Sequence, residues 1–263
     1  MAGTRRVAKT KAGITTGRYL ELKKEKTSPT TKLVPLLHPA GGLVYHARAA
    51  RLAGGKWTDF RASIGHWLTE WQPAVKGLLL VGPSAGYTIP SAWLSQFDEV
   101  VAIDFDPLAK RIFQARHREC RVTQWIGEDI FPVTAQGIDW KPLKIRLRQF
   151  PNHAVLFSNV LGQIAMSSPH EEAVERSLAH LPEILHDRAW ASYHDRLSAP
   201  YRPVLPSQAV HQSDFELACD AFREGGEVVS HSTGLLGQSL ACETFAWECR
   251  KDYWHLIEAC CSS

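Results

Sequence analysis

Residues suited to binding a nucleoside are concentrated in one segment, from Leu78 to Ala109. Residues 82–87, GPSAGY, form a glycine turn between an apolar run and a helical stretch. Its glycines allow a sharp turn and a close ligand approach, and the helix that follows presents free N–H groups. Asp104 ends the next apolar run, where a carboxylate can accept hydrogen bonds from both ribose hydroxyls. This combination predicts a site for an adenosine-containing ligand.

A second segment, residues 193–196, has the side chains that acid–base chemistry requires. At the end of another apolar run it combines a base, His194, an acid, Asp195, and an anion-binding cation, Arg196. We predict that His194 is a general base, and that Asp195 orients it or acts itself. In the alternative interpretation, Asp195 forms a solvated ion pair with Arg196, and His194 satisfies the strand end. His231, in a later loop, is a further candidate base.

The elements that must position these residues alternate in type after Pro73. Short apolar runs predict strands at 77–81, 99–104, 121–126, 153–158 and 189–194. Helices are predicted between them at 89–96, 107–117, 142–149 and 171–186. This alternation is typical of a parallel sheet built from βαβ units. A helix at 213–223 follows, then strand-like runs at 227–231, 244–250 and 253–259, of which the last two predict a hairpin.

Three of these segments, LLLVGPSAGY, VVAIDFDPLA and QWIGEDIF, together resemble the class I S-adenosylmethionine-dependent methyltransferases. In that family the first strand ends in a GxGxG loop, the second in an acid, and the third in an acid or polar residue that holds the adenine amine. The resemblance implies that S-adenosylmethionine is the cofactor and that Gly82, Gly86, Asp104 and Asp129 bind it. Ser84, whose hydroxyl can bond a carboxylate, and Asn159 are further candidate cofactor-binding residues. Asn159 is also a catalytic candidate, because it follows the fourth strand and can bond either the substrate or the methionine end of the cofactor.

The same resemblance implies an α/β fold over residues 74–263. This would be a Rossmann-like, mostly parallel seven-stranded sheet with helices on both faces and a C-terminal antiparallel hairpin. The implied activity is methyl transfer to a small molecule or peptide. The chain departs from the family pattern at Ser84, which replaces the middle glycine, and at Leu80, where an acid commonly stands.

Two other functions stay open. A nicotinamide-dependent oxidoreductase also uses a glycine turn and a ribose acid, but its GxGxxG motif would need glycines where Ser84 and Tyr87 stand. A module that binds S-adenosylmethionine without catalysis is the other alternative, because no NPPY or DPPY motif follows the fourth strand.

The N-terminal third differs in composition from the rest. Residues 1–32 carry a net charge of +7 and few large apolar side chains, which predicts a disordered basic tail. The rest of the chain carries −4, so nucleic-acid binding would have to rest on the tail, which is alternatively a solubilising extension. Residues 33–73 predict a helical extension with an aromatic stripe from Trp57 to Trp71, which we interpret mainly as packed core.

Composition narrows the class of protein further. The longest charge-free stretch, 77–97, is interrupted by glycines and prolines, so no membrane span is expected. The six cysteines form no CxxC pair, which favours thiols in a reducing cytoplasm. The twelve histidines show no zinc-ligand spacing, so no metal is predicted. The oligomeric state is left open.

Overall fold

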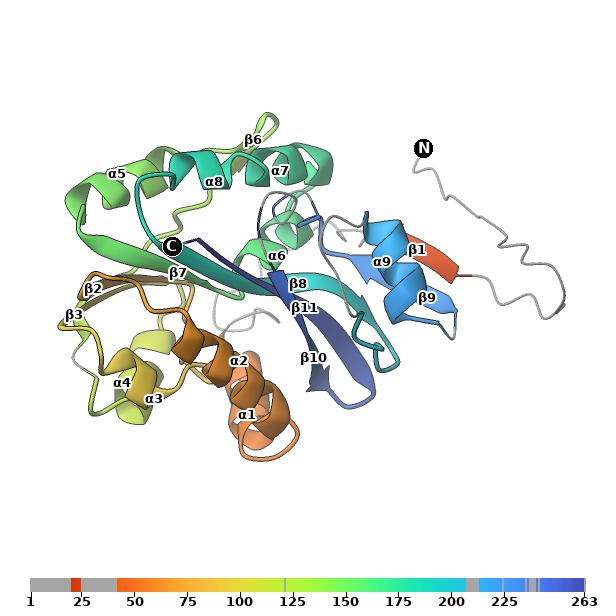
Figure 1. Ribbon diagram of the computed structural model, residues 1–263, viewed down its shortest axis with the longest axis horizontal. Coiled ribbons are helices and arrows are strands. Elements are labelled where there is room, and N and C mark those ends of the chain that lie inside the picture. Colours follow the sequence, from red (N-terminus) through yellow and green to blue (C-terminus); the bar gives the residue numbers. More distant parts are fainter. Residues whose placement is uncertain are drawn as a thin grey trace, which may run out of the picture.

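The computed structural model describes residues 20–24, 42–120, 122–206, 213–223, 225–234, 236, 240 and 242–262 (Figure 1). Most of the predicted basic tail, and the start of the predicted helical extension, lie outside the described residues. The division of the chain after residues 32 and 73 stays a prediction.

The centre of the molecule is a sheet whose parallel strands follow the order β4-β3-β2-β7-β8. Their bounds are β2 Gly77–Val81, β3 Glu99–Ile103, β4 Val122–Ile126, β7 His153–Ser158 and β8 Trp190–Ala199. Numbered along the chain this order is 3-2-1-4-5, the order of the Rossmann fold, and its topological switch point lies between β2 and β7. All five strands match predicted ones.

A C-terminal hairpin completes this side of the sheet. β11 (Tyr253–Ser262) pairs antiparallel with β8, and β10 (Cys242–Arg250) pairs antiparallel with β11. The predicted fold class, a mostly parallel Rossmann-like sheet with a C-terminal antiparallel hairpin, is therefore confirmed. The hairpin also joins Cys242 to Cys260 in a disulfide, so the expectation that the cysteines remain thiols is wrong for this pair.

The sheet has nine strands, and the predicted number of seven is wrong by two. β8 has ten residues and extends past the end of β7, so its last residues need another partner for their backbone groups. β9 (Gly226–Ser230) supplies it by pairing antiparallel with β8, and β1 (Leu20–Lys24) pairs parallel with β9. The prediction of a disordered tail is therefore wrong for Leu20–Lys24.

Helices cover both faces of the sheet, as predicted (Figure 1). One face carries α1 (Gly42–Ala53), α2 (Thr58–Glu70), α3 (Ser91–Leu94) and α4 (Ala109–Arg116). The other carries α5 (Lys141–Gln149), α7 (Glu171–Leu178) and α8 (Leu181–Ile184). Alternate residues of β2 point to opposite faces: Leu78 packs in the core with α2, and Leu79 packs in the core with α5. The aromatic stripe of α2 is buried in the first of these cores, which confirms its interpretation as packing.

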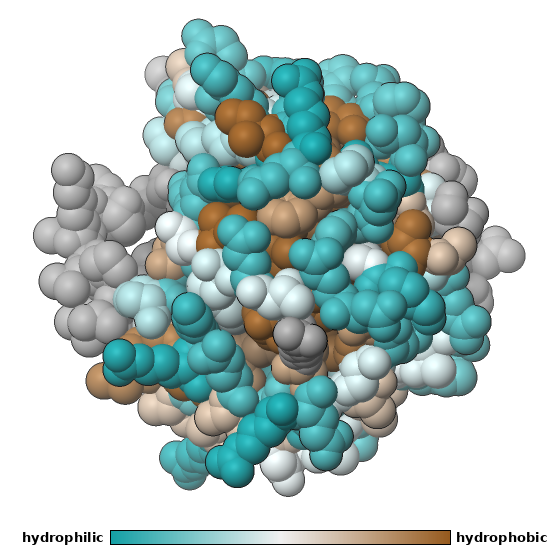
Figure 2. Space-filling view, turned by 90° about the vertical axis from the view of Figure 1, so that its left-hand side faces the viewer, coloured by the Kyte–Doolittle hydropathy of each residue, from teal (hydrophilic) through white to brown (hydrophobic). Residues whose placement is uncertain are grey.

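The remaining elements are short. α6 (Leu161–Ile164) and the 3-10 helix η2 (Ala165–Ser167) follow β7, and α9 (Asp214–Ala221) packs beside β8 and β9. β5 (Val133–Thr134) and β6 (Gly137–Ile138) form a separate two-stranded sheet. The longest helix in the described ranges is α2, with 13 residues, and no described helix has the length and hydropathy needed to cross a membrane. The face seen in Figure 2 is mainly hydrophilic, with apolar side chains in small separate patches.

Candidate functional site

The glycine turn begins where β2 ends, beside the switch point of the sheet. Gly82, Ser84 and Gly86 all have left-handed backbone angles, with φ of +64°, +49° and +62°. A side chain at Gly82 would place its Cβ 2.6 Å from Cβ of Val160, so only glycine fits there. Ser84 adopts an angle that side-chain-bearing residues rarely adopt, and such strain is concentrated at functional sites.

Asp104 ties this turn to the end of β3. The Ser84 amide N–H donates to Asp104 Oδ2 over 2.7 Å, and the Asp106 amide N–H donates to Asp104 Oδ1 over 2.8 Å. Each carboxylate oxygen keeps a lone pair that can accept a ligand hydroxyl. Burial raises the pKa of Asp104 to about 6, against the lowering effect of these two hydrogen bonds.

Two groups beside Asp104 face solvent. Phe105, the next residue, is 60% exposed, although it is a large aromatic. Asp129 follows β4, the strand paired with β3, and is also exposed; its Oδ1 accepts a hydrogen bond from the Phe131 amide over 3.0 Å. Sequence analysis identified Asp129 but not Phe105. The signal in the sequence that could have identified Phe105 is its position as an aromatic residue directly after the acid at the end of a strand.

Asn159 stands on the other side of the switch point, directly after β7. Its φ is +51°, a second strained position at this edge. Its side-chain Oδ1 accepts from the Asp195 amide over 3.1 Å, and its own amide donates to the Tyr193 carbonyl over 2.8 Å. With Oδ1 engaged, Asn159 is held in one orientation, and its Nδ2 is the group that can donate to a ligand.

Asp195, at the same edge, pairs with a histidine that sequence analysis did not identify. His255 Nδ1 lies 2.7 Å from Asp195 Oδ1. Burial alone would lower the pKa of His255, but the Asp195 carboxylate outweighs it and holds that pKa well above the ordinary value. Burial likewise would raise the pKa of Asp195, but His255 holds it below its usual range. At neutral pH the pair is therefore an imidazolium and a carboxylate.

His231, the further candidate from the sequence, lies next to this pair. Its ring centroid is 5.4 Å from that of His255, and its Nε2 is 3.0 Å from the Ser198 hydroxyl. Burial lowers the pKa of His231 to about 4. It is therefore a neutral histidine beside a charged one.

His194 lies on the opposite face of β8 from Asp195. Successive side chains of a strand alternate between faces, so the two residues predicted to act together are separated by the sheet. His194 is fully buried, with Nδ1 3.0 Å from the Ser192 hydroxyl and Nε2 3.6 Å from Glu258 Oε1. His194 therefore faces away from the side of β8 on which Asp195 and His255 meet, and its catalytic role stays a prediction.

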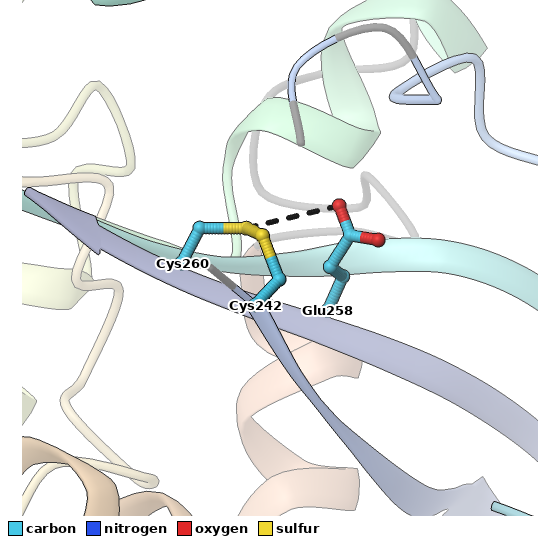
Figure 3. Close-up of side chains that lie close together, drawn as sticks. All are labelled: Cys242, Glu258 and Cys260. Carbon is cyan, nitrogen blue, oxygen red and sulfur yellow. Dashed lines mark hydrogen bonds between the residues drawn. A yellow bond between two sulfur atoms is a disulfide. The ribbon is translucent and has the colours of Figure 1, made fainter. Parts of the chain in front are cut away.

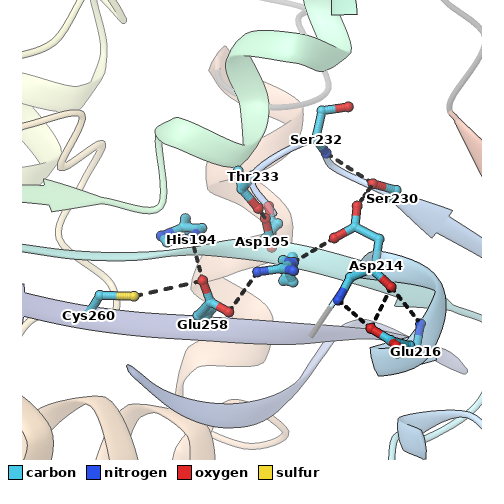
Figure 4. A network of polar contacts seen from close by, with 11 residues as sticks. His194, Asp195, Asp214, Glu216, Ser230, Ser232, Thr233, Glu258 and Cys260 are labelled. Carbon is cyan, nitrogen blue, oxygen red and sulfur yellow. Dashed lines mark hydrogen bonds and ion pairs between the residues drawn. The ribbon is translucent and has the colours of Figure 1, made fainter. Parts of the chain in front are cut away.

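Arg196 is also buried on that face and bridges two carboxylates, Glu258 and Asp214, which Figure 4 labels. Its Nη1 donates to Glu258 Oε2 over 2.9 Å, and its Nε donates to Asp214 Oδ1 over 2.7 Å. The solvated Asp195–Arg196 pair that formed the alternative interpretation is not present, because each residue has its own buried partner.

These residues form two groups, named by their place in the fold. The carboxyl-edge site consists of Gly82, Ser84, Gly86, Asp104, Phe105, Asp129, Asn159, Asp195 and His255. The β8–β11 cluster consists of Ser192, His194, Arg196, Cys242, Glu258 and Cys260.

Helix α1 closes one side of the carboxyl-edge site. Asp106 accepts a hydrogen bond from the Gly42 amide over 2.6 Å and lies 3.1 Å from His46 Nε2.

Comparison with known proteins finds similar solved structures only. No family model and no curated protein matches the chain. The N-methyltransferase NodS of Bradyrhizobium japonicum WM9, in complex with S-adenosylhomocysteine, is 13% identical over 83% of this chain and 96% of its own, with a TM-score of 0.43. The magnesium protoporphyrin IX methyltransferase ChlM of Synechocystis PCC 6803, with bound S-adenosylmethionine, is 14% identical over 85% of this chain and 86% of its own, with a TM-score of 0.41.

Proposed function

We propose that the chain is an S-adenosylmethionine-dependent methyltransferase. The observation that carries this proposal is the antiparallel β11 beside β8, after five parallel strands in Rossmann order. In dinucleotide-binding Rossmann folds the sixth strand follows the order 3-2-1-4-5-6 in a mostly parallel sheet. The hairpin found here is the one that the methyltransferase resemblance implies, so the sheet supports methyl transfer over nicotinamide-dependent oxidation.

The carboxyl-edge site fits this cofactor. The Ser84 hydroxyl is buried next to the Tyr45 hydroxyl and makes no hydrogen bond of standard geometry among the described residues, so it can bond the carboxylate of the methionine moiety. Asp104 can accept from the ribose hydroxyls, and the exposed ring of Phe105 can stack on the adenine. The Asp129 carboxylate can accept from the adenine amine.

The acceptor side of the proposal rests on Asn159, Asp195 and His255. The bound cofactor would supply an electrophilic methyl group on its sulfonium, so the chain has to align an acceptor and remove its proton if it carries one. Asn159 Nδ2 can donate to the acceptor or to the cofactor. We assign the acid–base role to Asp195 and His255, since His194 faces the other way. His255 accepts a proton only after losing its own, so turnover should rise with pH above neutrality.

The proposed acceptor is a small molecule or peptide. Residues 33–263 carry a net charge of −4, which does not favour a nucleic acid held by the folded body. Binding of nucleic acid would depend on the basic segment 1–32.

Calorimetry with S-adenosylmethionine, S-adenosylhomocysteine and NAD tests the cofactor. The proposal expects both sulfur ligands to bind and NAD not to bind. Absence of binding by either sulfur ligand at high micromolar concentration would refute it, and binding of NAD alone would favour the oxidoreductase. Mass spectrometry of ligand released from the denatured protein provides an independent identification.

A further inference from the structure

The β8–β11 cluster contains a set of side chains with metal-ligand spacing. Within the described residues, one group of possible ligands consists of two cysteines and a carboxylate: the ligand atoms of Cys242, Glu258 and Cys260 lie within 4.8 Å of one another (Figure 3). Cys260 and Glu258 are two residues apart on β11 and share a face, and Cys242 is opposite Cys260 on β10. The group therefore comes from two neighbouring strands.

A candidate fourth ligand atom, on β8, lies beside Glu258. His194 is paired with Glu258 across the two strands, and it is completely buried. Its Nε2 has no hydrogen-bond partner among the described residues and lies 3.6 Å from Glu258 Oε1. That distance is too long for a hydrogen bond. His194 Nε2 thus has an ion-pair contact with Glu258 but no hydrogen bond, and a buried polar nitrogen without a hydrogen bond can be explained by a bound ion.

Two of the ligand-atom separations match those of a tetrahedral metal centre, and reduction of the disulfide would have to let the two sulfurs separate and approach His194. Zinc binds sulfur at about 2.3 Å and nitrogen or oxygen at about 2.0–2.2 Å, so neighbouring ligand atoms lie about 3.3–3.8 Å apart. His194 Nε2 and Glu258 Oε1 are 3.6 Å apart, and Cys260 Sγ and Glu258 Oε1 are 3.8 Å apart. Both separations are close to the distances between neighbouring ligand atoms in such a centre.

The side chains that hydrogen-bond to these ligands are also arranged as in protein metal sites. Ligating histidines and carboxylates are usually held by hydrogen bonds from their second polar atom. His194 Nδ1 is 3.0 Å from the Ser192 hydroxyl, and Glu258 Oε2 accepts from Arg196 over 2.9 Å. Both ligands are thus oriented through the atom that does not face the cluster. The Arg196 guanidinium also offsets the net charge of −1 on a zinc ion bound by two thiolates, one carboxylate and a neutral imidazole.

We propose that the reduced protein binds one zinc ion through Cys242, Cys260, Glu258 and His194, and that the Cys242–Cys260 disulfide is the oxidised, metal-free form of the same site. A dithiol reductant would supply two electrons and two protons, becoming a disulfide itself and leaving two protein thiols. Each thiol releases its proton to solvent as its sulfur binds the metal. A disulfide oxidant reverses the exchange: it accepts the two electrons and takes two protons from solvent to become a dithiol, the Cys242–Cys260 bond re-forms, and the zinc ion leaves. This inference does not depend on the proposed methyl transfer.

The test compares reduced and oxidised full-length protein. One sample is reduced with a dithiol and desalted without oxygen, the other is oxidised, and both are incubated with Zn²⁺, desalted again and analysed by elemental mass spectrometry. We expect about one zinc ion per reduced chain and almost none per oxidised chain. A reduced chain that keeps no zinc, or an oxidised chain that keeps as much, would overturn the proposal.

Variants identify the ligands. Cys242→Ser and His194→Gln should each abolish stoichiometric binding, and Ser192→Ala should weaken it about 10- to 100-fold. Cys261→Ser is the matched control, because Cys261 is next to Cys260 but packs on the opposite face of β11, with the core that includes α2. Equal zinc binding by Cys242→Ser and by Cys261→Ser would contradict the assignment.

A measurement on the unmodified chain covers the case in which a ligand variant does not fold. Cobalt replaces zinc in tetrahedral sites and reports its ligands by absorption. The reduced wild-type chain with Co²⁺ should show thiolate-to-cobalt charge transfer and intense visible bands of a tetrahedral ion. Cobalt bound without charge transfer would exclude both cysteines and refute the site.

Discussion

The carboxyl-edge site and the β8–β11 cluster are only one residue apart on β8, yet they are built differently. At the edge, the backbone is strained at Ser84 and Asn159, and side chains such as Phe105 remain open to solvent. In the cluster, Glu258 and Arg196 are almost completely buried and bonded to each other. An exchangeable organic ligand needs access and spare hydrogen-bonding capacity, whereas an ion needs enclosure by converging ligands. Substitutions in the carboxyl-edge site should therefore change turnover or ligand affinity. Substitutions in the β8–β11 cluster should instead change the free energy of unfolding.

The largest expected effect is on turnover at the edge. His255→Asn should lower methyl-transfer turnover about 100- to 10,000-fold, because general acid–base catalysis contributes that much. Affinity for S-adenosylhomocysteine should stay within about twofold of wild type, since His255 is assigned to the acceptor. Single-turnover kinetics and calorimetry measure the two quantities. An unchanged turnover would remove His255 from the acid–base role.

The next effect is on the stability of the cluster. Glu258→Ala should lower the free energy of unfolding by about 1–3 kcal/mol, because it removes one of the two carboxylates that pair with the buried Arg196 and leaves Nη1 without its hydrogen bond to Glu258. Glu243→Ala, on the adjacent strand of the hairpin but exposed, should cost under about 1 kcal/mol. Urea unfolding under oxidising conditions measures both. A similar loss for the two variants would contradict the special status of the cluster.

A smaller effect is expected on cofactor affinity. Asp104→Ala should weaken binding of S-adenosylmethionine and S-adenosylhomocysteine about 10- to 100-fold, because both ligands carry the ribose that Asp104 is proposed to hold. Asp98→Ala is the control, because Asp98 is an exposed carboxylate that directly precedes β3, whereas Asp104 directly follows it. Calorimetry compares the variants. Equal binding by Asp104→Ala and Asp98→Ala would refute the assignment of Asp104.

The pH dependence of that affinity tests the same carboxylate. The ionised form of Asp104 accepts both hydroxyls, and its pKa is about 6, so affinity should rise as the pH increases from 5 to 7. The rise should be about tenfold for S-adenosylhomocysteine and level off above pH 7. Asp104→Asn carries no titrating group and should remove the rise, as measured by calorimetry across the range. A rise that persists in this variant would have to come from another group.

The smallest effect concerns the adenine. Phe105→Ala should weaken adenosine-ligand affinity about 2- to 10-fold, the range expected for loss of one aromatic stacking contact. Leu43→Ala removes a side chain that is also 60% exposed, on the neighbouring helix α1, and should leave affinity unchanged. Competition binding with S-adenosylhomocysteine resolves changes of this size. Equal losses in the two variants would argue against stacking on Phe105.

Sequence reasoning succeeded where the interacting residues are close together along the chain. The strand, glycine turn and helix around Gly82 are contiguous, and each element has its own local pattern. It failed at His255, because that residue reaches Asp195 only through the pairing of β11 with β8, sixty positions away. It also failed at Leu20–Lys24, where a partner strand more than two hundred residues away offsets the cost of ordering a polar segment.

The α/β class, the five parallel strands and the position of the glycine turn beside Asp104 follow from local patterns in the sequence, because hydrophobic period and turn chemistry are local properties. The face of the sheet that each residue of β8 occupies depends on long-range strand pairing. A shift of one residue along a strand exchanges its faces, and the bulge where β8 meets β11 alters the alternation further. For that reason Asp195 lies with His255 at the edge, while His194 lies with Glu258 and the two cysteines on the other side of the sheet.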